Sequence, residues 1–231
     1  MSDPARYAIY WAPNPDSPLG RFGAAWLDPA GRFPWPHHDG TSDPAAEAAR
    51  RAAIAAPSVY GFHATLKPPF RLAGGADIAR LQARIAVFAA SRPALRSIEL
   101  TLAPLGDFLA LVPAASRPDI DALAASCVRD LDAFRAPPTD AELARRRAAG
   151  LSVAQEALLR RWGYPYVMEA FRFHMTLTGR LDRDALAAMR GRLEGLMEAW
   201  ATPVDFVDIA LFRQSEPGGD FVLVRRFALG G

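Results

Sequence analysis

The alternation of apolar and polar residues predicts short strands separated by amphipathic helices along most of the chain. A period of two, rich in aromatic and branched residues, predicts strands at 6–11, 59–66, 98–102, 108–112, 170–178, 204–212 and 221–227. Apolar residues three or four positions apart predict helices at 44–56, 76–90, 118–134, 151–162 and 182–200. Proline and glycine clusters separate the elements, and Pro68-Pro69 is expected to close the second strand.

The order of these elements occurs twice. A strand, a helix and two further strands fill about residues 57–113, and the same order fills about 166–229. A helical insertion of about 114–165 separates the two repeats. An internal repeat of this kind predicts two pseudo-symmetric lobes within a single bilobal domain, 1–231. The expected class is α+β, in which each lobe is a β-α-β-β repeat with an antiparallel sheet, helices lie outside and a cleft separates the lobes.

The first strand of each repeat carries the same short motif. Residues 61–67 read GFHATLK and residues 172–178 read RFHMTLT, so a gapless alignment matches Phe, His, Thr and Leu. The chain has only four histidines, and two of them stand in this motif. A period of two brings one set of side chains to a common face of each strand: His63, Thr65 and Lys67 in the first, and Arg172, His174 and Thr176 in the second. One copy alone would fit a buried His–Thr pair, but the repetition favours a functional site.

Composition narrows the class of protein. Hydrophobic residues make up 51% and charged residues 23%, as in an ordinary globular protein, and the formal charge of +2 does not by itself make a nucleic-acid-binding stripe. The single cysteine, Cys127, excludes an internal disulfide and a cysteine metal cluster. Apolar runs are shorter than the roughly 18 residues that span a membrane. The first residues lack signal-peptide character, so a cytoplasmic protein without membrane contact is expected.

The basic residues are almost all arginine, and Lys67 is the only lysine. Its place on the His63 and Thr65 face predicts a phosphate contact, with coincidence as the alternative. The arginine runs at 145–147 and 160–161 are expected to form a solvated face. His37 and His38 are expected in a solvated loop, because no further ligands follow at metal-binding spacing.

Two imidazoles, each beside a hydroxyl, suit a displacement at a phosphodiester. One neutral histidine takes a proton from the attacking oxygen, and the other, as imidazolium, gives a proton to the leaving oxygen. Threonine hydroxyls can bond the non-bridging oxygens as charge shifts in the transition state. The chain lacks the clustered Asp and Glu of a metal phosphatase, so neither a metal nor a cofactor is expected.

The duplicated His-x-Thr-Leu motif resembles the signature of the two-histidine (2H) phosphoesterase superfamily, which includes the LigT-like RNA cyclic phosphodiesterases. The wording YGFHATLKPPF at 60–70, and WGYPYV to FRFHMTLTG at 162–179, is similar to a bacterial branch named phosphonate metabolism proteins. The resemblance implies a hydrolase, a 2H-type cyclic phosphodiesterase, with these catalytic residues: His63, Thr65, His174 and Thr176. It implies a small cyclic phosphodiester as substrate, such as a ribose or nucleotide cyclic phosphate linked to phosphonate metabolism.

Further substrate contacts are expected around the motifs. Lys67 and Arg172 share the motif faces, and Arg213 stands at the end of the strand that is predicted at 204–212. Tyr10, Tyr164 and Tyr166 are candidates to flank a sugar or a base, with core packing as an equal alternative for each.

Two other functions stay open. One is an enzyme that processes RNA ends carrying a 2′,3′-cyclic phosphate, for which a basic groove with stacking aromatic residues would be needed. The other is a non-catalytic module that binds phosphate or RNA. RNA is the less expected partner because the helical insertion departs from the compact RNA enzymes. No obligate protein partner is evident.

Overall fold

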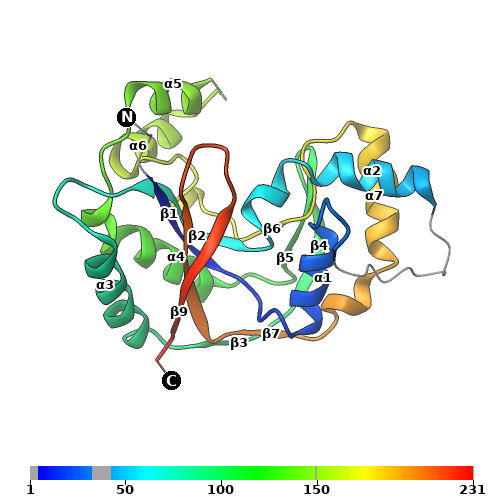
Figure 1. Ribbon diagram of the computed structural model, residues 1–231, viewed down its shortest axis with the longest axis horizontal. Helices are drawn as coiled ribbons and strands as arrows, with labels where there is room; N and C mark the ends of the chain where they lie inside the picture. Colours follow the sequence, from blue (N-terminus) through cyan, green and yellow to red (C-terminus); the bar gives the residue numbers. More distant parts are fainter. Residues whose placement is uncertain (1–4, 33–42, 149, 231) are drawn as a thin grey trace.

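The computed structural model of the chain describes residues 5–32, 43–148 and 150–230 (Figure 1). The predicted loop with His37 and His38 lies outside the described residues. The strands are β1 Arg6–Trp11, β2 Ala64–Arg71, β3 Leu95–Ile98, β4 Leu100–Leu105, β5 Phe108–Pro113, β6 Met175–Thr176, β7 Val204–Phe206, β8 Asp208–Gln214 and β9 Phe221–Ala228.

Helices and short 3-10 turns connect these strands. The α-helices are α1 Pro18–Trp26, α2 Pro44–Ile54, α3 Ile78–Ala90, α4 Pro118–Asp130, α5 Asp140–Arg147, α6 Val153–Trp162 and α7 Arg183–Glu194. The 3-10 turns are η1 Pro57–Tyr60, η2 Asp132–Phe134, η3 Met168–Ala170 and η4 Met197–Trp200. Capping boxes at Thr139 and Ser152 begin α5 and α6, and Gly163 ends α6 with a φ of 74°. Among the described helices, none is both long and apolar enough to cross a membrane.

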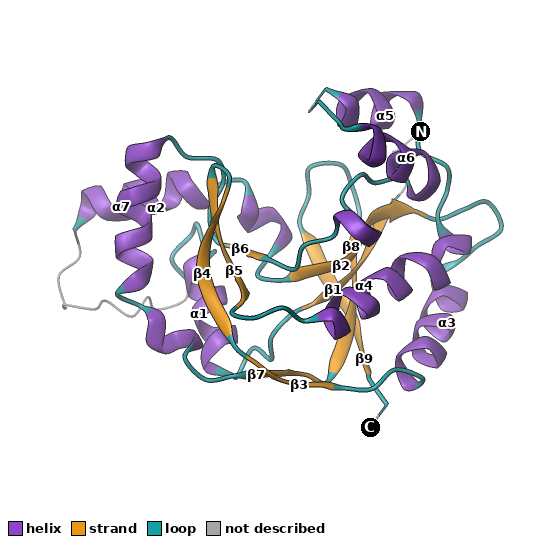
Figure 2. Cartoon of the chain, turned by 180° about the vertical axis from the view of Figure 1, so that it is seen from behind, coloured by secondary structure: helices purple, strands orange, loops and turns teal. Residues whose placement is uncertain are grey.

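The strands form a seven-stranded antiparallel sheet in the order β4-β5-β6-β2-β1-β8-β9, with β3 and β7 as a separate pair. Figure 2 shows β4 and β5 on one side of the molecule, the group β1, β2, β8 and β9 on the other, and β6 between them. The predicted two-lobed α+β class with antiparallel strands is confirmed.

Each side of the molecule combines parts of both repeats. The first repeat is observed as β2-α3-β3-β4-β5 and the second as β6-α7-β7-β8-β9. The β4–β5 hairpin joins β6 of the second repeat, whereas β8–β9 joins β2 of the first repeat through β1. Helix α3 packs against β8 and β9, and α7 packs against β5. The periodicity of the sequence did not reveal this exchange, because strand partners are chosen by long-range contacts.

The two motif strands differ from their predicted limits. Strand β2 continues through Pro68 and Pro69 to Arg71, because the β2–β1 ladder is irregular there and β6 pairs with β2 at Ala64, before the prolines. The second predicted motif strand, 170–178, is reduced to the two residues of β6. The ladder between the motif strands is therefore very short.

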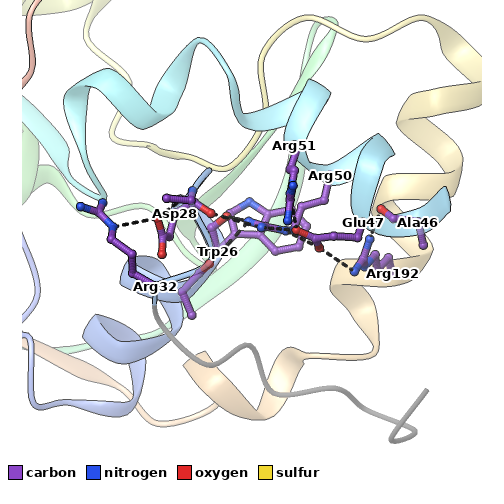
Figure 3. A network of polar contacts seen from close by, with 10 residues as sticks. Trp26, Asp28, Arg32, Ala46, Glu47, Arg50, Arg51 and Arg192 are labelled. Atoms are coloured by element: carbon purple, nitrogen blue, oxygen red, sulfur yellow. Dashed lines mark hydrogen bonds and ion pairs between the residues drawn. The ribbon is translucent and has the colours of Figure 1, made fainter. Parts of the chain in front are cut away.

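A buried network connects α2 and α7 with the end of α1, on the side of the molecule that carries β4 and β5 (Figure 3). Arg50 of α2 donates to the carbonyl oxygens of Trp26 and Asp28, and its guanidinium forms two hydrogen bonds with Glu47, at 2.6 and 2.9 Å. Arg192 of α7 reaches the same carboxylate at 3.8 Å. The side chain of Arg50 is only 2% exposed, so the buried carbonyl oxygens of Trp26 and Asp28 would lose their donor without gaining water if it were removed.

Replacing Arg50→Met should therefore lower the free energy of unfolding by about 2–4 kcal/mol, measured by urea denaturation. Arg51→Met is the matched control, since Arg51 bonds the same Glu47 at 3.1 Å but is 56% exposed. Its loss should stay within about 0.5 kcal/mol. Equal losses in the two variants would contradict a structural role for the buried guanidinium.

Candidate active site

The register between β2 and β6 brings the two motifs to one face of the sheet. Ala64 lies opposite Met175, and both side chains are fully buried in the main core. Because side chains alternate along a strand, the residues that flank this pair point to the other face: His63, Thr65, His174 and Thr176. In a regular ladder the two histidines would be diagonal neighbours, about 7–8 Å apart and somewhat less between their Cβ atoms. A phosphate group fits between two imidazoles at that spacing.

The backbone fixes the same ring orientation in both histidines. Nδ1 of His63 lies 2.9 Å from the carbonyl oxygen of Gly61, and Nδ1 of His174 lies 2.8 Å from that of Arg172. A carbonyl oxygen only accepts hydrogen bonds, so each Nδ1 carries the hydrogen. Each Nε2 is then an acceptor in the neutral ring and a donor in the charged ring. The Nε2 atom of His63 is 3.2 Å from Oγ1 of Thr65.

The surroundings of His63 favour its neutral form. Its ring stacks on Tyr10 with centroids 3.7 Å apart, and the ring of Tyr60 lies 6.4 Å away. Burial lowers the pKa of His63 to about 4, although its hydrogen bond to Gly61 acts in the opposite direction. The charge of His174 lowers the pKa of His63 further. The two imidazoles are thus electrostatically coupled.

The second histidine has a different environment. His174 is half-buried, and the ring of Phe108 lies 5.9 Å from its imidazole. Thr176 is paired with Ala110 of β5, and Arg172 is exposed next to the motif. Both imidazoles are half-buried, but the hydrogen bond that orients His63 is partly buried and that of His174 is exposed, so His174 is the more open of the two.

The opposite face of each motif is anchored in the core. The ring of Phe62 packs so closely on Gly23 of α1 that a Cβ at that glycine would lie 1.9 Å from it. At the end of the second motif, Trp26 Nε1 donates to the carbonyl oxygen of Leu177 at 2.7 Å. Oγ1 of Thr178 accepts a hydrogen bond from the Leu109 backbone at 2.9 Å. These contacts position both motif strands without using the side chains of the two histidines or of Thr65 and Thr176.

The three predicted tyrosines lie along this face. Tyr10 is buried beneath His63, and Tyr164 is half-buried with the guanidinium of Arg146 4.6 Å above its ring. Tyr166 is exposed and contacts Tyr164 edge-on at 5.7 Å. Burial raises the pKa of both Tyr10 and Tyr164, so their phenols stay protonated at neutral pH.

Two predicted phosphate contacts are not brought to the site. The Lys67 ammonium is buried, where it donates to the Val128 carbonyl oxygen at 3.0 Å and pairs with Asp132 at 3.3 Å. Burial lowers its pKa to about 8, and Asp132 offsets part of that effect. Arg213 lies opposite Tyr7, on the face that carries the main core and away from Tyr10. These placements correct the expectation for both residues. A strand pattern shows neither the ion pair of Lys67 with Asp132 nor the strand beside which Arg213 lies.

Several residues near the motifs are not predicted by the sequence pattern. Tyr60 and Phe108 flank the two imidazoles. Farther along the face lies a cavity of about 40 Å³, here called the arginine pocket, whose basic lining is Arg6, Arg71, Arg135, Arg145 and Arg146. The alternation of β1 could have placed Arg6 on the Tyr10 face. Arg145 is exposed and Arg146 is half-buried, in keeping with the predicted solvated face, and both also line this pocket.

Within the described parts of the chain, no three His, Cys, Asp or Glu side chains are grouped so that they could hold a metal ion.

Comparisons with known proteins give a family and distant structural neighbours. The model of a family described as "Protein of unknown function (DUF1045)" matches residues 65–222. A ribose 1,5-bisphosphate phosphokinase PhnN of Janthinobacterium sp. (strain Marseille) is 39% identical over 98% of this chain and 51% of its own length. A protein of the same name in Laribacter hongkongensis (strain HLHK9) is 38% identical over 95% of this chain and 51% of its own length. The chain thus spans about half the length of these curated relatives.

Among solved structures, E. coli LigT complexed with NADP+ is similar with a TM-score of 0.45 and 14% identity, over the whole of both chains. Kluyveromyces marxianus Usb1 is similar with a TM-score of 0.41 and 10% identity, over 99% of both chains. These two likenesses are distant and show nothing about the role of this chain. Because the TM-scores lie below 0.5, the chemistry below rests on the two motifs and their geometry.

The pKa of His63 can be tested by NMR titration of its ring Cε1–H signal, assigned with a His63→Ala variant. The signal should titrate near pH 4, well below the ordinary value of 6.5. His174→Ala should raise this pKa, because a neighbouring positive charge is removed. Between pH 6.5 and pH 4, His63 is protonated in the unfolded chain but not yet in the folded one. The free energy of unfolding should therefore fall as the pH falls through this range. A pKa of about 6.5 for His63 that stays the same in the His174→Ala variant would contradict both the burial of His63 and its coupling to His174.

Proposed function

Because the chain belongs to the DUF1045 family of unknown function and carries two matched His-x-Thr motifs, we propose that it is a metal-independent phosphoesterase that hydrolyses a small cyclic phosphodiester. The observation that carries this proposal is the register of Ala64 with Met175, since it turns both histidines and both threonines to one face. A site for binding alone would not need two titratable groups with different environments.

The proposed reaction uses the two Nε2 atoms in turn. A water oxygen attacks phosphorus while its proton passes to neutral His63. The bond from phosphorus to one ring oxygen breaks, and His174, as imidazolium, protonates that oxygen. The hydroxyls of Thr65 and Thr176 donate to the non-bridging oxygens. The products are a phosphate monoester and a free hydroxyl, so atoms and protons balance.

The asymmetry of the pair supports this assignment of roles. A general base must be neutral before the reaction, and the low pKa of His63 keeps it so at neutral pH. The stacked Tyr10 ring and the Gly61 hydrogen bond hold the His63 ring with Nε2 toward the site. His174 lies in the more open position, where a charged ring costs less.

We place the substrate among ribose cyclic phosphates. The curated relatives are named for a kinase of ribose 1,5-bisphosphate, and hydrolysis of a ribose cyclic phosphate also leaves a ribose phosphate monoester. The chain spans about half of those relatives, so the named kinase activity is not transferred to it. This link also supports a place in phosphonate metabolism, in keeping with the branch that the motifs resemble.

Changing either catalytic histidine to alanine should lower the hydrolysis rate by ~10²–10⁴, the usual share of a general acid or base. The double variant should be little worse than the worse single one, because both groups act in one step. The assay follows phosphate monoester release from ribose and nucleoside cyclic phosphates, with EDTA present. Arg213→Ala, on the other face of the sheet, should keep its rate. Full activity in a histidine variant, or loss of activity with EDTA, would refute the mechanism.

The rate should be bell-shaped in pH. On the acid side activity is lost as His63 gains a proton, and its lowered pKa should place this limb well below 6.5. On the basic side activity is lost as the general acid gives up its proton. Because the two histidines are coupled, each limb of the profile reports an apparent pKa of the pair and not of a single residue. A profile of kcat/KM with EDTA from about pH 4 to about pH 9 measures them. A single rising limb would indicate a hydroxide nucleophile without an acid partner.

A further inference from the structure

The arginine pocket lies at the end of the motif face that is far from the histidines. Its walls come from β1, β2, the segment after η2, and α5, with Tyr164 closing one side. Its volume of about 40 Å³ exceeds the ~10–15 Å³ that a single water needs, so there is room for a small oxyanion.

The pocket holds an excess of positive charge. Arg71 pairs with Glu142 at 3.0 Å, and Arg135 pairs with Asp132 through two bonds of 2.7 and 3.0 Å. The other three arginines have no carboxylate partner within the described residues: Arg6, Arg145 and Arg146.

Two of these three have neutral neighbours instead. The Nε of Arg6 donates to the side-chain amide oxygen of Gln214 at 2.7 Å, and Arg146 lies over the neutral Tyr164 ring. Guanidinium groups held around one cavity without counter-ions are suited to a phosphate, which they can bind with paired hydrogen bonds.

The pocket and the histidines share one surface. Arg6 and Tyr10 stand four residues apart on the same face of β1, about 13 Å along the strand. The ring of Phe221 joins them, with Arg6 5.7 Å above it and the Tyr10 ring 6.0 Å away. Both Arg6 and Tyr164 influence the pKa of Tyr10, on which His63 stacks.

We infer that the arginine pocket binds a terminal phosphate monoester of the same molecule whose cyclic phosphate is opened at the histidines. The substrate class is then a small sugar cyclic phosphodiester that carries a second phosphate, with the sugar lying over Tyr10 and Tyr164. This inference rests on the proposed function for its cyclic half. The terminal phosphate takes no part in bond breaking and serves to hold the sugar in place. The product is a sugar bisphosphate.

A binding experiment tests the pocket without turnover. Calorimetry with ribose 5-phosphate should detect binding to the wild-type protein and to His63→Ala. Arg145→Gln or Arg146→Gln should weaken it about tenfold or more, as expected when a charged hydrogen bond is lost. Arg147→Gln is the matched control, because Arg147 stands on the same helix but pairs with Glu156 at 2.7 Å. Absent binding, or binding equal in all variants, would overturn the inference.

A kinetic experiment links the pocket to the reaction. Adenosine 2′,3′-cyclic phosphate is compared with the same nucleotide bearing a 5′-phosphate, and wild-type kcat/KM should favour the second at least tenfold. Arg145→Gln should bring this ratio toward one, whereas Arg147→Gln should leave it unchanged. Turnover of both at equal rates would overturn the inference alone, whereas turnover of neither would defeat the proposed function. Faster hydrolysis of an oligoribonucleotide with a cyclic end would overturn the small-sugar assignment.

Discussion

The pairing of Ala64 with Met175 is the contact on which the site depends. A shift of one residue in either strand would turn its histidine and threonine into the core. The observed ladder is too short to hold this register by itself, since β6 has only two residues. The register is instead held from outside, by the bond from Trp26 to Leu177 and by the bond from the Leu109 backbone to Thr178. The buried Arg50 network is part of this support because it binds the carbonyl of Trp26.

The two copies of the motif gain different properties from what surrounds them. Both histidines bind the carbonyl oxygen two residues before them, so the local backbone treats them alike. Strand β1 then covers His63 with Tyr10, whereas β5 leaves His174 partly open beside Phe108. Acid–base catalysis needs one neutral and one charged partner, and burial separates the two states without any change in the motif. A duplicated sequence can thus serve a reaction that is not symmetric.

Arginine has several different roles in this protein, and burial and partners decide among them. Arg50 is enclosed by carbonyls and a carboxylate, and it joins helices. Arg147 and Arg160 share Glu156 at the surface, where such pairs contribute little. Arg145 and Arg146 stand next to Arg147 in the sequence but line a cavity without an acidic partner in the described residues. A run of three identical residues therefore divides between a solvated face and a candidate anion site, since a helix turns each side chain to a different direction.

The sequence by itself determined the α+β class, the repeated element order and the matched motifs, because these follow from local periodicity and from residues that recur. It also placed the imidazole and hydroxyl of each motif on one face, since alternation in a strand is a local property. Tertiary structure decided which strands pair, and so exchanged the hairpins between the repeats. It also drew Lys67 into an ion pair with Asp132, turned Arg213 away, and gathered arginines from distant segments. These outcomes depend on contacts between residues far apart in the chain, which a period of two or of 3.6 does not encode.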